Sequence, residues 1–166
     1  MPNILCFSRN RCTAVEQMDE QTMRSSCYLQ DPLREISVEI RVKLPDLEIT
    51  GADGKVVRSV GEEKIEVGDS LQKVIGIRIG PGLRKILGGV MGKSAIHKHL
   101  TFMVEECCNA VILAFTKEVL LFAPKDKWGE KKYFENRVKA NPRLYNSCAA
   151  LAPDSPLMEG IERPWE

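Results

Sequence analysis

The sequence lacks the features that would assign it to several broad classes of protein. Its 166 residues carry a formal net charge of only +1, whereas nucleic-acid-binding domains usually have a clear basic excess. Its apolar stretches are too short to cross a membrane. The first residues show no basic segment followed by a long apolar run, as a secretory signal would. We therefore expect a cytoplasmic protein with neither nucleic acid nor membrane as a partner.

The six cysteines lack the spacing of a structural zinc site, since no two of them form a Cys-x-x-Cys pair. In a reducing cytoplasm they are expected to remain thiols rather than to form disulfides. Internal repeats and low-complexity segments are also missing. What is present, 43% hydrophobic and 28% charged residues, is the composition of an ordinary globular domain.

The first third of the chain predicts an antiparallel sheet. Residues 35–44 alternate strictly between apolar and polar side chains, and this period of two places the apolar set on one face of a strand. The connections are too short for the crossover helices that parallel strands need. The segment from Gly51 to Gly54 is interpreted as a tight turn, because Asp-Gly favours hairpins. Further strands are expected at residues 4–9, 13–18, 22–29 and 47–50.

From residue 63 the apolar spacing becomes helical, and a short helix at 83–87 is expected to stop at Gly88-Gly89. The most coherent stretch runs from Gly88 to Phe122. It predicts a glycine-rich turn followed by one long helix with Ser94 as its N-cap. Apolar residues recur every three or four positions from Ile96 to Phe115. We expect this stripe to lie against the apolar face of the 35–44 strand.

Beyond Pro124 the sequence favours a charged helix at residues 125–140, with Trp128, Tyr133, Phe134 and Val138 as its buried contacts. Residues 152–166 contain three prolines and predict an extended tail, either loose or laid on a partner.

The predicted fold class is therefore α+β, with an N-terminal antiparallel β-meander of four to five strands and a C-terminal helical half packed on one face. We expect a core domain at residues 1–123, with strands within 4–50 and helices within 63–122. The charged helix and the proline-rich tail follow at 124–166.

Several short motifs occur in an order that resembles a known family. They are the opening Phe7-Ser8-Arg9, an acidic turn at Asp19 before the strand pair, the segment 74–82, Gly88-Gly89, and His99-Leu100 leading into the helix at 104–110. Over about residues 4–116 the chain resembles the uncharacterised prokaryotic domain-of-unknown-function family 2889.

The resemblance implies a fold class and no activity, because the family has none established. The family pattern has cysteine two residues before the histidine, where this chain has His97. A second family cysteine falls near Val67 or Gly68. A thiol or metal site that depends on those cysteines is therefore not expected to carry over.

Four residues of the long helix are candidate metal ligands: His97, His99, Glu105 and Cys108. His97, Glu105 and Cys108 share one helical face, and imidazole, carboxylate and thiolate suit zinc or iron. Glu105 lies two turns from His97, however, too far for one ion without another segment. The alternative is that His97 is a surface residue, that His99 stabilises the helix junction, and that the cysteine pair at 107–108 packs in the core.

Arg9 and Arg84 are candidates for an anion pocket, to which the amides of a helix starting at Gly82 would contribute. Lys93 lies in a Gly-Lys-Ser sequence that resembles part of a phosphate-binding loop. That loop is one residue too short, because Leu87 stands where the pattern needs glycine.

No catalytic constellation is complete, so we predict no catalytic residues and no required cofactor. The favoured function is a non-catalytic accessory or interaction subunit of a larger cytoplasmic assembly, with another protein subunit or a second copy as partner. Trp128 and Trp165 are the candidate partner-docking residues, since exposed tryptophan is costly in isolation. The alternative is a metal- or thiol-dependent binding protein or enzyme centred on the long helix, with zinc or iron as its metal.

Overall fold

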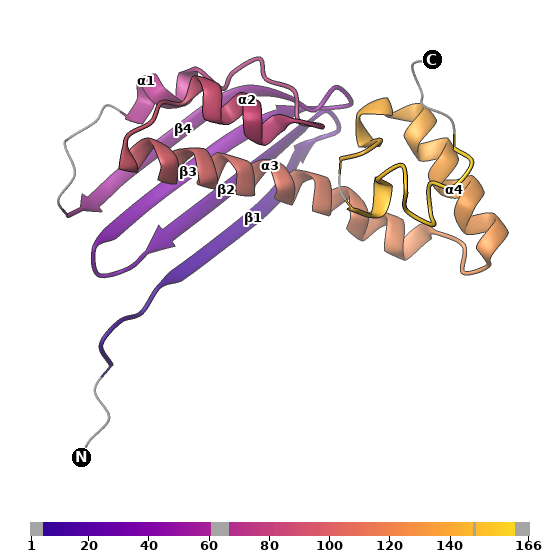
Figure 1. The fold of residues 1–166 in the computed structure, drawn as a ribbon, viewed down its shortest axis with the longest axis horizontal. Helices are drawn as coiled ribbons and strands as arrows, with labels where there is room; N and C mark the ends of the chain where they lie inside the picture. The colour runs from indigo at the N-terminus through magenta and orange to yellow at the C-terminus, as the bar shows by residue number, and fades with distance from the viewer. Residues whose placement is uncertain (1–4, 61–66, 148, 162–166) are drawn as a thin grey trace.

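A computed structural model describes residues 5–60, 67–147 and 149–161, apart from the side chains of 115, 116, 118–120, 127 and 143. A four-stranded antiparallel sheet forms one layer, and helices cover one of its faces (Figure 1). The fold class is therefore α+β, as the sequence predicts. No helix among the described residues is long and apolar enough to span a membrane.

The sheet is a simple meander with the order β1-β2-β3-β4. Its strands are β1 (Asn10–Asp19), β2 (Thr22–Gln30), β3 (Arg34–Lys43) and β4 (Glu48–Ser59). The strand predicted at 13–18 is confirmed as part of β1, whereas the separate strand predicted at 4–9 is wrong over residues 5–9, because β1 begins only at Asn10. Asn10 pairs with Gln30, the last residue of β2, so residues 5–9 run past the end of the sheet. They form an arm that projects from the body (Figure 1).

The turn predicted from Gly51 to Gly54 is also wrong, because β4 runs straight through it. The reason for glycine here is packing. A Cβ atom on Gly54 would lie 2.6 Å from Cδ1 of Leu71 and 2.9 Å from the carbonyl oxygen of Ser37. Gly54 thus lets α1 (Val67–Gln72), which carries Leu71, lie directly on β4.

We predict that Gly54→Ala destabilises the fold by about 1–3 kcal/mol, because the added methyl group has no space between β4 and α1. The matched control is Gly68→Ala within α1, where a Cβ atom meets nothing within 4 Å. That change should be neutral or stabilising by up to about 1 kcal/mol. Urea denaturation of both variants measures the difference, and equal stabilities would contradict this account of Gly54.

The helix α2 (Leu83–Val90) does not stop at Gly88-Gly89 as predicted. Leu83, Leu87 and Met91 are all buried at four-residue spacing, and the Met91 N–H donates to the Leu87 carbonyl. Burial of this apolar row outweighs the low helical propensity of the two glycines.

The long helix α3 (Ala95–Phe122) crosses the apolar face of the sheet (Figure 1). Its predicted stripe is confirmed for the described side chains, whereas the Phe115 side chain lies outside them. On the sheet, the inward residues of β3 are equally buried, and the Ser25 hydroxyl donates to the Cys107 carbonyl at 3.0 Å. The buried stripe residues are Ile96, Leu100, Met103, Val104, Cys107 and Val111.

The last part of the chain packs beyond the end of the sheet, where α4 (Lys127–Ala140) is followed by η1 (Pro142–Leu144) and η2 (Ala149–Leu151) (Figure 1). The extended tail predicted from residue 152 is wrong up to 161, because consecutive turns fold it back and bury Met158 and Ile161. Val138 is buried as predicted. Trp128 is not, since it lies at the exposed start of α4.

Candidate functional site

His97 lies at the junction between α1 and the first turn of α3, and both of its ring nitrogens are engaged. Nε2 is 2.9 Å from Oγ of Ser70, and Nδ1 is 2.6 Å from Oγ of Ser94. Ser70 is buried on α1, whereas Ser94 directly precedes α3. A neutral imidazole donates from one nitrogen and accepts at the other, which two hydroxyl groups can match.

The local backbone fits the ring closely. Gly92 has a φ of +100°, and a Cβ atom there would lie 3.2 Å from Cγ of His97. The left-handed conformation and the close approach both favour glycine. The glycine-rich turn before α3 therefore accommodates the imidazole, and no phosphate is needed to explain it.

The hydrogen bonds of His97 link two helices and differ from those of a catalytic histidine. A serine and a histidine are two of the three members of a hydrolase triad, in which a carboxylate orients the imidazole and stabilises its positive charge. Here the two partners of His97 are both neutral hydroxyls. The ring instead ties α1 to the start of α3, and it offers a metal ion no nitrogen without losing a hydrogen bond.

We predict that His97→Ala lowers the free energy of unfolding by about 1–3 kcal/mol, because the buried Ser70 hydroxyl loses its partner. The neighbouring Lys98→Ala, on an exposed position, should change it by no more than about 0.5 kcal/mol. Urea denaturation compares the two. If both variants were as stable as the unchanged protein, His97 would not hold the junction.

The structure does not gather the four predicted metal ligands. Glu105 faces Arg84 of α2, with Oε2 3.8 Å from Nε, while Cys108 is wholly buried and His99 is half-buried one turn after the start of α3. In the described part of the chain, no three His, Cys, Asp or Glu side chains come together in a group that could hold a metal ion.

The two adjacent cysteines of α3 are packing residues. Burial raises the pKa of Cys107 to about 12 and also raises the pKa of Cys108. Because the thiolate is the reactive form, both sulfurs are inert near neutral pH. The Cys107 thiol points at the sheet, with Sγ 3.9 Å from the Val38 carbonyl oxygen.

We predict a large difference in alkylation rate between these thiols and Cys12, which is exposed on β1. At pH 8, Cys12 should react roughly a hundredfold faster or more than Cys107 and Cys108 in the folded protein. Brief labelling followed by peptide mass spectrometry measures each site, and labelling in urea is the control in which the difference should vanish. Rapid native labelling of Cys108 would show that α3 carries an accessible thiol.

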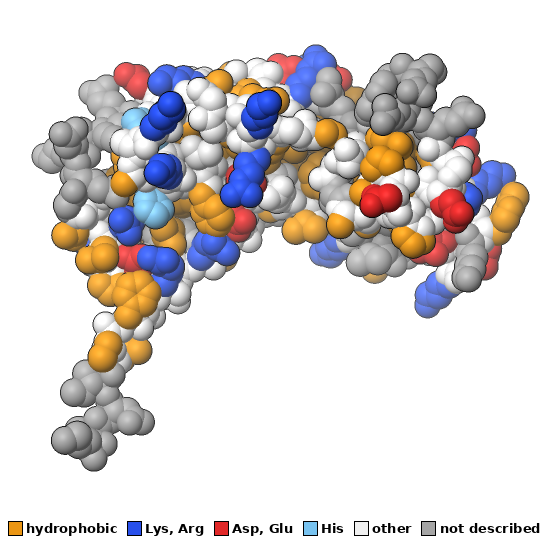
Figure 2. All heavy atoms as spheres, in the orientation of Figure 1, with side chains coloured by type: hydrophobic (Ala, Val, Ile, Leu, Met, Phe, Trp, Pro, Cys, Tyr) orange, Lys and Arg blue, Asp and Glu red, His pale blue; other side chains and the backbone are white. Residues whose placement is uncertain are grey.

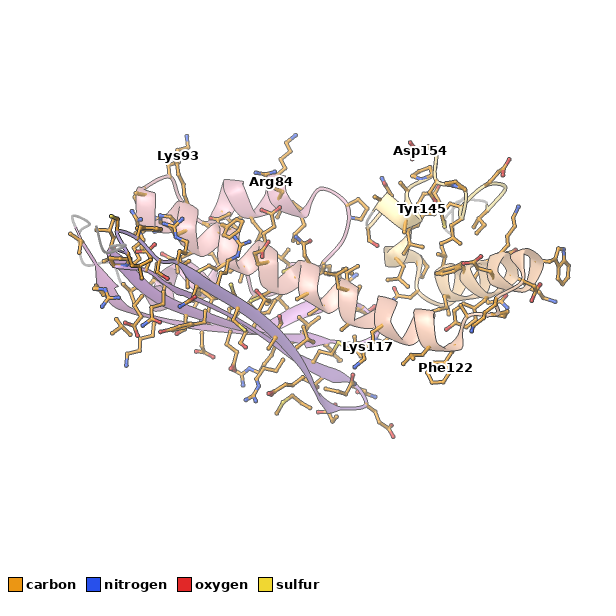
Figure 3. The ribbon with its side chains drawn as sticks, turned by 90° about the horizontal axis from the view of Figure 1, so that it is seen from below. Arg84, Lys93, Lys117, Phe122, Tyr145 and Asp154 are labelled. Atoms are coloured by element: carbon orange, nitrogen blue, oxygen red, sulfur yellow. The ribbon has the colours of Figure 1, made fainter. Side chains whose placement is uncertain are left out.

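The three candidate anion ligands lie in different places. Arg84 lines a cavity of about 200 Å³ between the start of α2, the middle of α3 and residues 146–147, and its side chain extends into solvent (Figure 3). Lys93 points outward from the turn before α3 (Figure 3). Arg9 is bound to Asp31 at the end of the sheet.

Asp31 is a buried charge at the end of β2, which the sequence analysis does not single out. Its Oδ2 accepts from Nε of Arg9 at 2.9 Å. Its Oδ1 accepts from the backbone N–H groups of Leu33 and Arg34, both at 2.8 Å. Burial alone would raise the pKa of Asp31, but these donors lower it below its ordinary value. The carboxylate thus fixes the β2–β3 turn and the end of the N-terminal arm.

Large apolar side chains are exposed around the turn that joins α3 to α4. Leu121 is 69% exposed, Phe122 72% and Trp128 75%. Phe122 points away from the end of α3 (Figure 3). Of these, the sequence reasoning nominated Trp128 alone. The other predicted docking residue, Trp165, lies outside the described residues.

Comparisons with known proteins give no further guide, since no family model, no curated protein and no solved structure matches the chain. The resemblance to domain-of-unknown-function family 2889 stays a prediction.

Proposed function

We propose that the chain is a non-catalytic accessory subunit, which docks onto another protein of a larger cytoplasmic assembly through the α3–α4 turn. The observation that carries the proposal is the exposure of Leu121, Phe122 and Trp128. Single exposed apolar residues are ordinary, but several large ones at one end of a molecule mark an interaction site.

The length of α3 explains why this surface is available. Its 28 residues span about 42 Å, while the ten residues of β3 span about 33 Å. The carboxyl-terminal end of α3 therefore extends past the sheet (Figure 1). Phe122 therefore lies beyond the sheet, which buries the apolar stripe of the helix.

The docking surface has a fixed geometry. Asp126 caps α4 by accepting a hydrogen bond from the Gly129 N–H at 2.8 Å, and a capped helix start resists fraying. The ammonium group of Lys132 lies 5.3 Å from the centre of the Trp128 ring, which restrains the indole. A restrained side chain loses less entropy on binding, and tryptophan is a common anchor in protein interfaces.

The surroundings of the reactive groups support a role without catalysis. His97 bridges two serines, Glu105 faces Arg84, and Cys107 and Cys108 are buried. Cys12 is an exposed free thiol, a state that persists best in a reducing compartment such as the cytoplasm.

We predict that the double variant Phe122→Ser and Trp128→Ser releases the chain from its assembly without unfolding it. Burying each side chain is worth about 1.5–3 kcal/mol, so losing both should weaken docking by a hundredfold or more. The measurement is the size of the tagged chain in extracts of its own cells, by gel filtration with immunodetection. The unchanged chain should elute well above the mass of two copies, each 18.7 kDa.

The matched control is Ile86→Ser, which removes an exposed apolar side chain from α2 and should leave the large species intact. Thermal unfolding shows whether each variant is folded. An unchanged chain that elutes as one or two copies, or a folded double variant that keeps the large mass, would contradict the proposal.

A further inference from the structure

The two edges of the sheet differ, because backbone hydrogen bonds cover the start of β4. Beside β4, the Ile49 N–H donates to the Ile77 carbonyl and the Ile79 N–H donates to the Leu47 carbonyl, and α1 packs on the same strand. In the described part of the chain, β1 has a single strand neighbour, β2. Along the ten residues of β1, alternate residues therefore direct their backbone N–H and C=O groups away from β2, which is a template for a further strand.

The segment before β1 continues this template. Residues 5–9 run past the end of β2, and their apolar side chains are exposed, with Leu5 83% and Phe7 52% accessible. Figure 2 shows apolar side chains gathered along this projecting arm. Among the described residues of one chain, no strand lies beside this segment, because β2 ends opposite Asn10.

The charges along this edge favour one direction of pairing, although Arg9, Arg11 and Glu16 each also contact an opposite charge of their own chain. The start of β1 is basic, with Arg9 just before it and Arg11 within it, whereas its far half carries Glu16 and Asp19. A parallel copy would place arginine on arginine. An antiparallel copy places the basic end of each strand beside the acidic end of the other, which electrostatics favours.

We infer that β1 pairs antiparallel with β1 of a second copy of this chain, about a twofold axis at Ala14, to form a continuous eight-stranded sheet. The inference rests on the proposed interaction role and names one partner and its surface. A twofold axis perpendicular to the sheet places one residue opposite itself. Ala14 is the smallest side chain of β1, and it faces away from α3.

This register places compatible side chains opposite each other across the new strand pair. On the α3 side, Thr13 of each copy lies opposite Val15 of the other. Both are β-branched and half-buried, a combination that stabilises neighbouring strands. Toward the ends, Arg9 and Arg11 lie beside the segment of the other copy from Gln17 to Asp19.

The helix α3 supplies a second contribution on the same side. Arg11 lies over the ring of Phe102, 4.9 Å from its centre, so this face of α3 overhangs β1. Leu113 follows eleven residues later, only about 20° further around the helix. Phe102 is 38% exposed and Leu113 63%. A second copy brings its own α3 to the other side of the axis, where these side chains can be covered.

The test is the mass of the purified full chain by light scattering, from low to high micromolar concentration. We expect a dimer that dissociates on dilution. Ala14→Lys places two ammonium groups opposite each other at the axis, and it should raise the dimer dissociation constant at least about tenfold. Ser26→Lys is the matched control, because Ser26 pairs with Ala14 on β2 and lies one strand further from the axis. It should dimerise like the unchanged chain.

A cross-link tests the register. With Cys6 and Cys12 changed to serine, Ala14→Cys should form a disulfide-linked dimer on mild oxidation, whereas Ser26→Cys in the same background should not. A chain that stays monomeric at every concentration would overturn the inference, as would an undiminished dimer of folded Ala14→Lys. Cross-linking through Ser26→Cys rather than Ala14→Cys would equally contradict it.

These outcomes separate the inference from the proposed function. If the purified chain is monomeric but still enters a large species in extracts, the β1 dimer is contradicted and the accessory role is supported. If the chain forms a dimer and never exceeds two copies in extracts, the accessory role is contradicted and the dimer is supported.

Discussion

The contact between the stripe of α3 and the apolar face of the sheet is the interaction on which the rest of this structure depends. Met103, Val104 and Cys107 are fully buried on the helix, and Ile36 and Ile40 are fully buried on β3. Burial of this kind, at about 25 cal/mol per Å² of apolar surface, is the dominant favourable contribution to folding. The other elements are placed around this contact.

The same contact accounts for the surroundings of His97 and Cys107. The residues that suggest a metal or thiol site in sequence make packing contacts instead. The cysteines of α3 are buried in the core, and the first turn of α3 contacts α1. His97 serves that junction, and Cys107 points at the Val38 carbonyl. The surfaces that we propose for binding lie outside this contact. They are the end of α3, which extends past the sheet, and the outer edge of β1.

Much of this fold follows from patterns that the sequence displays openly. The strict alternation at 35–44 and the helical spacing from Ile96 are periodic over many residues, and such signals survive tertiary packing. Short signals do not. Asp53-Gly54 suggests a hairpin, yet Gly54 is needed so that Leu71 can approach β4. Which side chain meets which across distant segments is invisible in a local window.

The candidate site shows the same limit. The sequence places His97 and Glu105 on one helical face, which is correct for a helix. It cannot show that Ser70 of α1 bonds to His97, or that Arg84 of α2 faces Glu105. Likewise Phe122 is a large apolar residue of the kind usually found in a core. It is exposed because α3 is longer than the sheet beneath it.

The most direct test of this account compares Met103→Ala with Asn109→Ala by urea denaturation. Met103 is fully buried in the contact, whereas Asn109 is exposed on the same helix. If the stripe of α3 lies on the sheet, Met103→Ala should cost about 2–5 kcal/mol, and Asn109→Ala should change stability by no more than about 0.5 kcal/mol. Equal and small effects at the two positions would mean that this face of α3 is not buried, and the account would fail.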